Sequence, residues 1–278
     1  MVSLMLFQKG ITYACTGISL RSVDGSYIQA RTIEWSGSAL ESMYVIVPRG
    51  EQFTSYTPTG VNGLSFKAKY GMVGIAVVQK EFIAEGINEK GLSAGLFYFP
   101  GYGKYPLYNQ KNNSKTISDL QLTTWMLSQF SSVEEVIAAI DDVFVTTIQG
   151  DATVHWRIGD SSGRQVVLEY KDGRAMIYEN QVGVITNSPD FPWQVTNLSN
   201  YVNLYPGNSG IRQYNDHTVA PFGAGSGFLG LPGDFTPASR FVRAFFLSAT
   251  AVPMNTALES VIQSFKILNN FDIPIGVL

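Results

Sequence analysis

The chain has 278 residues, of which 45% are hydrophobic and 15% are charged, with a formal net charge of −3. This supports one large domain, since no Pro/Gly/Ser-rich linker or charge block divides the chain. The small net charge and the lack of a Lys/Arg stripe exclude the electrostatic footprint of a nucleic-acid-binding protein. No apolar run reaches the roughly 18–20 residues of a membrane span. One cysteine excludes an intrachain disulfide.

The first fourteen residues, MVSLMLFQKGITYA, differ in character from the rest of the chain. Thr12 and Ala14 give the small-x-small pattern that signal peptidase reads before its cut. We therefore expect residues 1–14 to be a leader or propeptide, removed by signal peptidase or by self-cleavage, with residues 15–278 forming a single domain. A retained N-terminus is the alternative. An export leader predicts a periplasmic or secreted protein, and its absence predicts a cytoplasmic one.

Cys15 opens a strand-like run over residues 15–20. Cutting the bond between Ala14 and Cys15 would give one residue both a thiol and a free α-amine. Their reference pKa values, about 8.5 and about 7.7–8.0, both lie near physiological pH. The neutral amine can take a proton while the sulfur attacks a carbonyl, as with terminal threonine nucleophiles. The alternative interpretation is a buried structural cysteine.

The turn pair Asp24-Gly25 splits the runs 16–20 and 26–35 and predicts a β-hairpin. The second strand carries Arg31 and Glu34, which the hairpin returns toward Cys15. A guanidinium near the sulfur favours the thiolate, and a carboxylate can orient the ammonium form of a terminal amine. The alternative is an ordinary ion pair at a strand end.

Further along the chain, strands are expected over 43–47, 72–78 and 91–99, and helical periodicity of apolar residues covers 118–140. That helical region divides at Ser131-Ser132, where either serine can cap a second helix. An antiparallel meander comes next, over 153–158, 165–170, 175–179 and 182–186. Residues 200–230 are expected to form a long loop over a site. Two helices, 237–249 and 255–268, complete an α+β pattern.

Histidine is scarce, and a papain-type dyad would need His155 or His217 beside Cys15. His155 lies on a strand flanked by aromatic residues, where a histidine more often belongs to the core. No clustered spacing of metal ligands suggests a metal site. The glycine-rich stretch 223–227 does not run from a strand into a helix as a dinucleotide-binding loop does. We therefore expect no cofactor.

Five motifs occur in order along the chain: Cys15-Thr16-Gly17; Ala30-Arg31-Thr32-Ile33-Glu34-Trp35; Gly86-Ile87-Asn88-Glu89-Lys90-Gly91-Leu92; Val184-Ile185-Thr186-Asn187-Ser188-Pro189; and Leu231-Pro232-Gly233-Asp234 with Ser239-Arg240-Phe241. From Cys15 to the last residue, the chain resembles the choloylglycine hydrolase family of N-terminal-nucleophile amidases. That family contains bile salt hydrolases and penicillin V acylases. Five ordered motifs are far more specific than any one of them.

The resemblance implies a four-layer αββα sandwich of two antiparallel sheets, with Cys15 as the mature first residue. It assigns Arg31 to the arginine near the thiol and Arg240 to the second active-site arginine. Asn187 would help form the oxyanion hole, which the backbone N–H of Tyr98 would complete. Glu34 stands where many members have aspartate, so its side chain is one methylene longer. Two of these residues also have a purely structural interpretation. Asn187 could belong to a Thr-Asn-Ser-Pro turn, and Arg240 could pair with Asp234.

The resemblance also implies a small N-acyl amide substrate with an apolar acyl group, such as a conjugated bile salt or penicillin V. Alternatives are an acyl-homoserine lactone, or a binding homologue that has lost catalysis. We expect aromatic residues to line the acyl pocket: Trp35, Phe66, Tyr98 and Phe222. A homo-oligomer, dimer or tetramer, is implied as well. Family members usually continue past residue 278 with further strands, so we expect those strands to be missing here and an apolar surface to be exposed.

Overall fold

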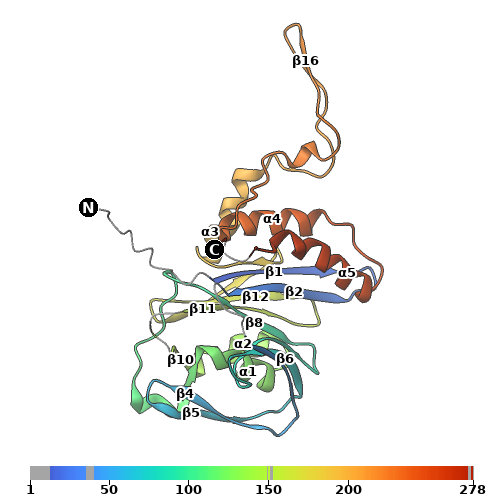
Figure 1. Cartoon of the computed structure of the whole chain (residues 1–278). Helices are drawn as coiled ribbons and strands as arrows, with labels where there is room; N and C mark the ends of the chain where they lie inside the picture. Colours follow the sequence, from blue (N-terminus) through green and yellow to red (C-terminus); the bar gives the residue numbers. More distant parts are fainter. Residues whose placement is uncertain (1–12, 36–40, 149, 151–152, 275–276, 278) are drawn as a thin grey trace, which may run out of the picture.

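The protein is a four-layer αββα sandwich, seen edge-on in Figure 1. The structure, a computed structural model, describes residues 13–35, 41–148, 150, 153–274 and 277; for Tyr13 and Trp35 it describes the backbone. Two helices cover one sheet, the second sheet lies beneath the first, and further helices cover the second sheet's far face. The expected αββα architecture is confirmed.

The upper sheet has the strand order β14-β1-β2 in the described part of the chain, and both pairings are antiparallel. The larger sheet has seven strands in the order β13-β12-β11-β8-β7-β6-β3, all antiparallel. The strands of these two sheets are β1 Tyr13–Arg21, β2 Tyr27–Trp35, β3 Ser42–Val47, β6 Met72–Val77, β7 Ile83–Asn88, β8 Ser93–Tyr98, β11 Val154–Gly159, β12 Gln165–Lys171, β13 Arg174–Glu179 and β14 Val184–Ile185.

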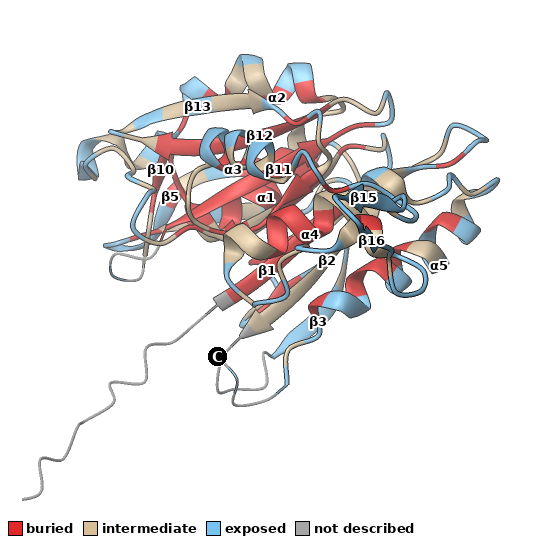
Figure 2. Ribbon diagram, turned by 90° about the horizontal axis from the view of Figure 1, so that it is seen from above, coloured by how far each residue is buried: buried red, intermediate tan, exposed pale blue. Residues whose placement is uncertain are grey.

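The helices bury their apolar faces on the sheets. Helices α4 (Pro237–Thr250) and α5 (Ala257–Leu268) lie over β1 and β2, as Figure 2 shows from above. Helix α1 (Asp119–Gln129) packs against β7 and β8 from below. Helix α2 (Val133–Ala139) starts at the predicted break, where the Ser132 hydroxyl caps the helix by accepting from the Glu135 N–H.

Several elements were not anticipated. They are α3 (Phe191–Asn197), the strand β7, the hairpin of β4 (Gln52–Thr57) and β5 (Gly60–Lys67), and the parallel pair β9 (Thr116–Ser118) and β10 (Phe144–Thr146). Strand β7 escaped prediction because Glu85 and Gly86 interrupt its apolar pattern. Both are required by packing: Glu85 forms ion pairs with buried arginines, and a Cβ on Gly86 would lie 2.8 Å from the Leu127 side chain.

The expected fourth meander strand over 182–186 is wrong in its pairing. The Gly183 N–H donates to Asn180 Oδ1 in a turn, and the chain crosses to the other sheet, where Val184–Ile185 pairs with β1. This crossing carries residues 186 and 187 to the start of β1. The sheet switch is therefore what brings Asn187 to Cys15.

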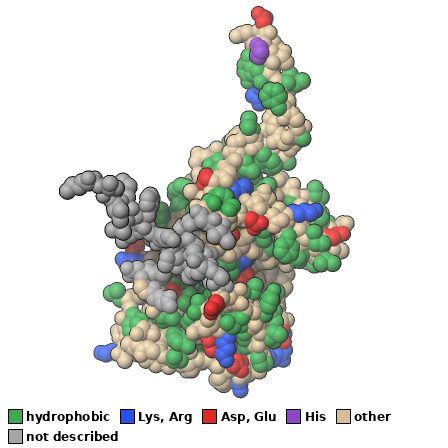
Figure 3. All heavy atoms as spheres, viewed as in Figure 1, with side chains coloured by type: hydrophobic (Ala, Val, Ile, Leu, Met, Phe, Trp, Pro, Cys, Tyr) green, Lys and Arg blue, Asp and Glu red, His purple; other side chains and the backbone are tan. Residues whose placement is uncertain are grey.

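Residues 202–230 form an arm, which contains β15 (Arg212–Tyr214) and β16 (His217–Val219). Instead of lying over a site as expected, the arm projects away from the four layers (Figure 1). Hydrophobic side chains are spread along it in Figure 3. Its exposed large apolar residues are Val202, Tyr205, Ile211, Tyr214, Val219, Phe222 and Leu229.

A second apolar surface lies on β3, β6 and β7. Tyr44 pairs with Ile75, Ile46 pairs with Val73, and Val73 pairs with Ile87, which places all five side chains on one face of the larger sheet. All five are exposed. This face borders a hollow of about 900 Å³ beside β2, which pairs with β1 alone in the described part of the chain.

Candidate active site

The β1–β2 hairpin places the predicted residues in register. Cys15 pairs with Ile33, Gly17 with Arg31, and Ala14 with Glu34. Because side chains alternate along a strand, Cys15 and Arg31 face the larger sheet while Glu34 faces the α4 layer. The thiol and the Glu34 carboxylate therefore lie on opposite faces of the hairpin, and the Cys15 backbone nitrogen lies between them.

Cys15 is buried, with 5% of its surface exposed. Next to it, Gly17 permits the two sheets to approach closely. A Cβ at this position would lie 2.8 Å from both Ile185 Cγ2 and Phe97 Cζ, and 2.9 Å from Arg157 Nη1. Glycine is required here for space.

Asn187 is the centre of the site. Its Oδ1 accepts from the Cys15 backbone N–H at 3.0 Å and from Arg240 Nη2 at 2.7 Å. Its Nδ2 donates to the Tyr98 carbonyl at 2.7 Å. Three strand ends and one helix thus meet at a single buried amide, and four of the residues predicted from sequence are joined by hydrogen bonds. One of the two amide hydrogens is used by Tyr98.

Arg240 reaches this amide from the first turns of α4. Its guanidinium also donates to the Cys15 carbonyl, to Thr16 Oγ1 and, through Nε, to the Phe235 carbonyl. The Asp234 carboxylate instead accepts from Thr236 and Ser239 at the start of the helix. Burial lowers the pKa of Arg240 to about 10, although the nearby Cys15 and Glu34 counteract this.

Glu34 carries a buried oxygen, Oε2, that has no hydrogen-bond partner among the described residues. Burial raises its pKa, and the charges of Arg240 and Arg31 partly offset that effect. Glu34 pairs with Ala14, next to Cys15 in the hairpin. A buried carboxylate oxygen without a partner destabilises the folded state unless a donor reaches it.

Arg31 is held between the sheets by groups that sequence analysis did not identify. Its guanidinium lies 3.4 Å from Glu85 Oε2 and 3.9 Å from the centroid of the Phe97 ring. Glu85 Oε1 also accepts from Arg157 at 3.1 Å. Glu85 is a single acidic residue in an otherwise apolar segment, and this could have indicated a buried ion pair.

Neither histidine is placed to act on Cys15. Both ring nitrogens of His155 are engaged, Nδ1 with Glu169 Oε1 at 3.2 Å and Nε2 with the Thr186 carbonyl at 3.0 Å. His217 is exposed on the arm. This geometry argues against a papain-type dyad.

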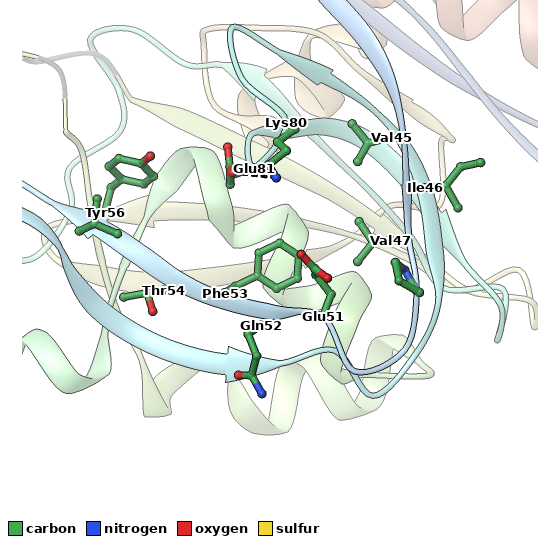
Figure 4. Close-up of a pocket in the computed structure, with 12 residues that line it drawn as sticks. Val45, Ile46, Val47, Glu51, Gln52, Phe53, Thr54, Tyr56, Lys80 and Glu81 are labelled. Atoms are coloured by element: carbon green, nitrogen blue, oxygen red, sulfur yellow. Dashed lines mark ion pairs between the residues drawn. The ribbon is translucent and has the colours of Figure 1, made fainter.

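The four aromatic residues expected to line a pocket are not brought together. Phe66 is buried in the cluster beneath the larger sheet, where it stacks on Phe53, and Phe222 is fully exposed on the arm. Tyr98 lies at the site, whereas the Trp35 side chain lies outside the described residues. Figure 4 shows a separate hollow near Phe53 and the Lys80–Glu81 ion pair. Its volume is about 370 Å³, and Cys15 does not line it.

Within the described ranges, no cluster of three or more metal-binding side chains is present. The same residues include no helix long and apolar enough to cross a membrane.

Comparisons with known proteins agree with this geometry. Residues 15–278 match the family model of linear amide C–N hydrolases, choloylglycine hydrolase family. The chain is 33% identical over 263 residues to a bile salt hydrolase/transferase of Clostridium perfringens, covering 92% of this chain and 78% of that protein. It is 26% identical to a penicillin V acylase of Pectobacterium atrosepticum, covering 99% of this chain and 74% of that protein. A mutant conjugated bile acid hydrolase from Clostridium perfringens superposes with a TM-score of 0.82 at 30% identity, covering 95% of this chain and 80% of that one.

Proposed function

The chain belongs to the choloylglycine hydrolase family of linear amide C–N hydrolases, and from this premise we propose that Cys15 is its nucleophile. The Cys15 thiolate attacks the carbonyl of an N-acyl amide and forms a thioester, which water then hydrolyses. The observation that carries this proposal is the amide of Asn187, which joins the Cys15 nitrogen, Arg240 and Tyr98 at one point.

Removal of residues 1–14 turns the Cys15 nitrogen into an α-amine that serves as the base and then protonates the departing nitrogen. The family match supports this, since it begins at Cys15. The new ammonium group would also supply a donor near the unpartnered Glu34 Oε2. Ala14 and Cys15 are both buried in β1. A cut before folding or by Cys15 itself is thus easier than attack on the folded chain by another protease.

The remaining residues have separate roles in this scheme. The Asn187 side-chain amide and the Tyr98 N–H stabilise the oxyanion, and the loss of one such donor typically costs about 10²–10³ in rate. Arg31 lies on the thiol's face of the hairpin and favours the thiolate. Arg240 fixes the Cys15 carbonyl and Asn187 Oδ1.

Conjugated bile salts are the proposed substrate class, because relatives at 33% and 32% identity are a bile salt hydrolase/transferase and a conjugated bile acid hydrolase. Penicillin V is the second candidate, supported by the acylase relative. Both classes present a linear amide with an apolar acyl group.

The test is hydrolysis of glycine- and taurine-conjugated bile acids, penicillin V and acyl-homoserine lactones by purified protein, with N-terminal mass spectrometry on the same sample. We expect active protein to begin at Cys15, and Cys15→Ser and Cys15→Ala to be inactive but folded. Full turnover with residues 1–14 still attached, or by Cys15→Ala, would refute the proposal.

We also propose that the protein is a homo-oligomer assembled through the arm. Seven exposed apolar side chains on a projecting segment form the kind of surface that usually meets a partner. Light scattering should give a dimer or tetramer for the wild type and a smaller species for Ile211→Ser/Phe222→Ser. A monomeric wild type at micromolar concentration would contradict this.

A further inference from the structure

His155 is a buried titratable group that the proposed reaction does not use. It is 1% exposed and lies between the sheets, stacked on Phe99 with ring centroids 4.3 Å apart and planes 7° apart. The Phe97 ring meets it edge-on. Only a hydrogen-bonded imidazole is tolerated in such a place, and both of its nitrogens are bonded.

The partners of the two nitrogens fix the protonation state. The Thr186 carbonyl oxygen, 3.0 Å from Nε2, can only accept a hydrogen bond. Glu169 Oε1, 3.2 Å from Nδ1, also accepts from the Phe191 N–H at 2.8 Å. Oε2 has no hydrogen-bond partner among the described residues, but the Lys171 ammonium lies 3.6 Å from it. The N–H bond and the positive charge of Lys171 favour the ionised carboxylate, which can only accept. With acceptors on both sides, each ring nitrogen must carry a hydrogen.

The charged group in direct contact with the ring is Glu169, whereas Arg157, two residues along β11, is paired with Glu85. Glu169 and Lys171 face the imidazole region from β12, and Lys171 also binds Asp190 at the start of α3. Phe97 on β8 and Phe99, just after β8, are uncharged, and the negative face of the stacked Phe99 ring attracts a cation. From α4, the Arg240 guanidinium donates to Asn187 Oδ1 and has no hydrogen bond to His155.

The segment held by His155 leads directly into the candidate site. Thr186 precedes Asn187, and its hydroxyl donates to the Pro237 carbonyl at the start of α4, the helix of Arg240. The Asn187 carbonyl accepts from Gln194 of α3, the helix whose first N–H binds Glu169. A displacement of the Thr186 carbonyl would therefore move the Asn187 amide relative to Cys15.

We propose that His155 is a positioning residue that, as an imidazolium bonded to Glu169 and the Thr186 carbonyl, fixes Asn187 for catalysis. This inference rests on the proposed function for its kinetic consequence. Its structural part, the doubly protonated ring, does not depend on any activity. His155 does not touch the substrate or the reacting atoms in this scheme.

The structural part is tested by NMR of protein labelled with [¹⁵N]histidine. His217→Gln leaves His155 as the one histidine in the chain, so its ring signals need no further assignment. We expect both ring nitrogens to be protonated at pH 7.5, and Glu169→Gln to release one of the two protons. A neutral ring with one bare nitrogen in the His217→Gln protein would overturn the proposal, whether or not the enzyme is active.

The kinetic part uses two substitutions on the processed enzyme. His155→Phe keeps the ring stacking but removes both hydrogen bonds. We expect kcat to fall on the order of 10- to 100-fold and KM to stay within about threefold of the wild-type value. A small misplacement of a catalytic group can lower the rate by up to about 10²-fold. His155→Gln can still donate to Thr186 and should recover part of kcat. Unchanged kcat in a folded His155→Phe protein would refute the positioning role. A folding failure of His155→Phe leaves the NMR result to decide.

Discussion

Replacing Asn187 with alanine tests the candidate site most directly. The substitution removes the oxygen that accepts hydrogen bonds from the Cys15 N–H and the buried Arg240 guanidinium. It also removes the amide group that donates to the Tyr98 carbonyl. A bond to a charged group contributes about 1.5–3 kcal/mol and a neutral one about 0.5–1.5 kcal/mol. The free energy of unfolding should therefore fall by about 3–5 kcal/mol.

The effect on catalysis should exceed what the stability loss explains. Without the Asn187 amide, the oxyanion loses one donor, and kcat should fall by about 10²–10³ even where the protein is fully folded. Urea unfolding monitored by fluorescence measures the first quantity. Steady-state hydrolysis of a glycine-conjugated bile acid measures the second.

Asn187→Asp is the matched control, because it keeps Oδ1 for Cys15 and Arg240 but has no amide hydrogen for Tyr98 or for the oxyanion. We expect it to lose less stability than Asn187→Ala, since its charge strengthens the bond to Arg240, while its turnover stays equally low. An Asn187→Asp enzyme with wild-type turnover would refute oxyanion stabilisation by this residue. A stability loss below about 1 kcal/mol for Asn187→Ala would refute its central place in the hydrogen-bond network.

Three further substitutions test other parts of the structure. Burial raises the pKa of Asp119 from 3.8 to about 7. The stability of the folded protein is therefore unaffected below about pH 4 and falls as the pH rises through 7, by about 4 kcal/mol at pH 8 or above. In urea unfolding, the free energy of unfolding of Asp119→Asn relative to the wild type should increase by this amount between pH 4 and pH 8. A difference that stays constant with pH would contradict the burial effect. Gly17→Ala should cost about 1–3 kcal/mol, because its methyl group would lie 2.8 Å from Ile185 and Phe97; an unchanged unfolding midpoint would disprove the close sheet contact. Ile46→Lys should reduce aggregation beyond the arm-mediated oligomer in light scattering, because the side chain is 80% exposed on the apolar face of β3, β6 and β7; unaltered scattering would show that this face does not associate.

Local sequence signals predicted most of the elements near the site. The Asp24-Gly25 turn predicted the hairpin of β1 and β2, and the register of that hairpin brings Arg31 and Glu34 back beside Cys15. The 3.6-residue periodicity predicted α1 and α2, and the two helices expected over 237–249 and 255–268 correspond to α4 and α5. Ordered motifs predicted the family and, through it, the two-sheet sandwich.

The signals failed where long-range contacts override local preference. Strand β7 contains Glu85 and Gly86, which reduce strand propensity but fit between Arg31, Arg157 and α1. The same limit applies to residues 182–186, whose apolar pattern fits a strand of either sheet. Phe66 and Phe222 were grouped by residue type, yet one is buried and the other exposed.

The amino-acid sequence by itself determined the single cysteine, its place at the start of a strand, and the motifs that identify the family, because composition and short-range spacing are properties of the chain alone. Only the tertiary structure decided that the chain changes sheets after residue 180 and so delivers Asn187 to Cys15, and that His155 is enclosed by two acceptors. Hydrogen bonds between residues 172 and 225 positions apart, such as Cys15–Asn187 and Cys15–Arg240, have no local pattern. They exist because two sheets and a helix pack against one another around a buried amide.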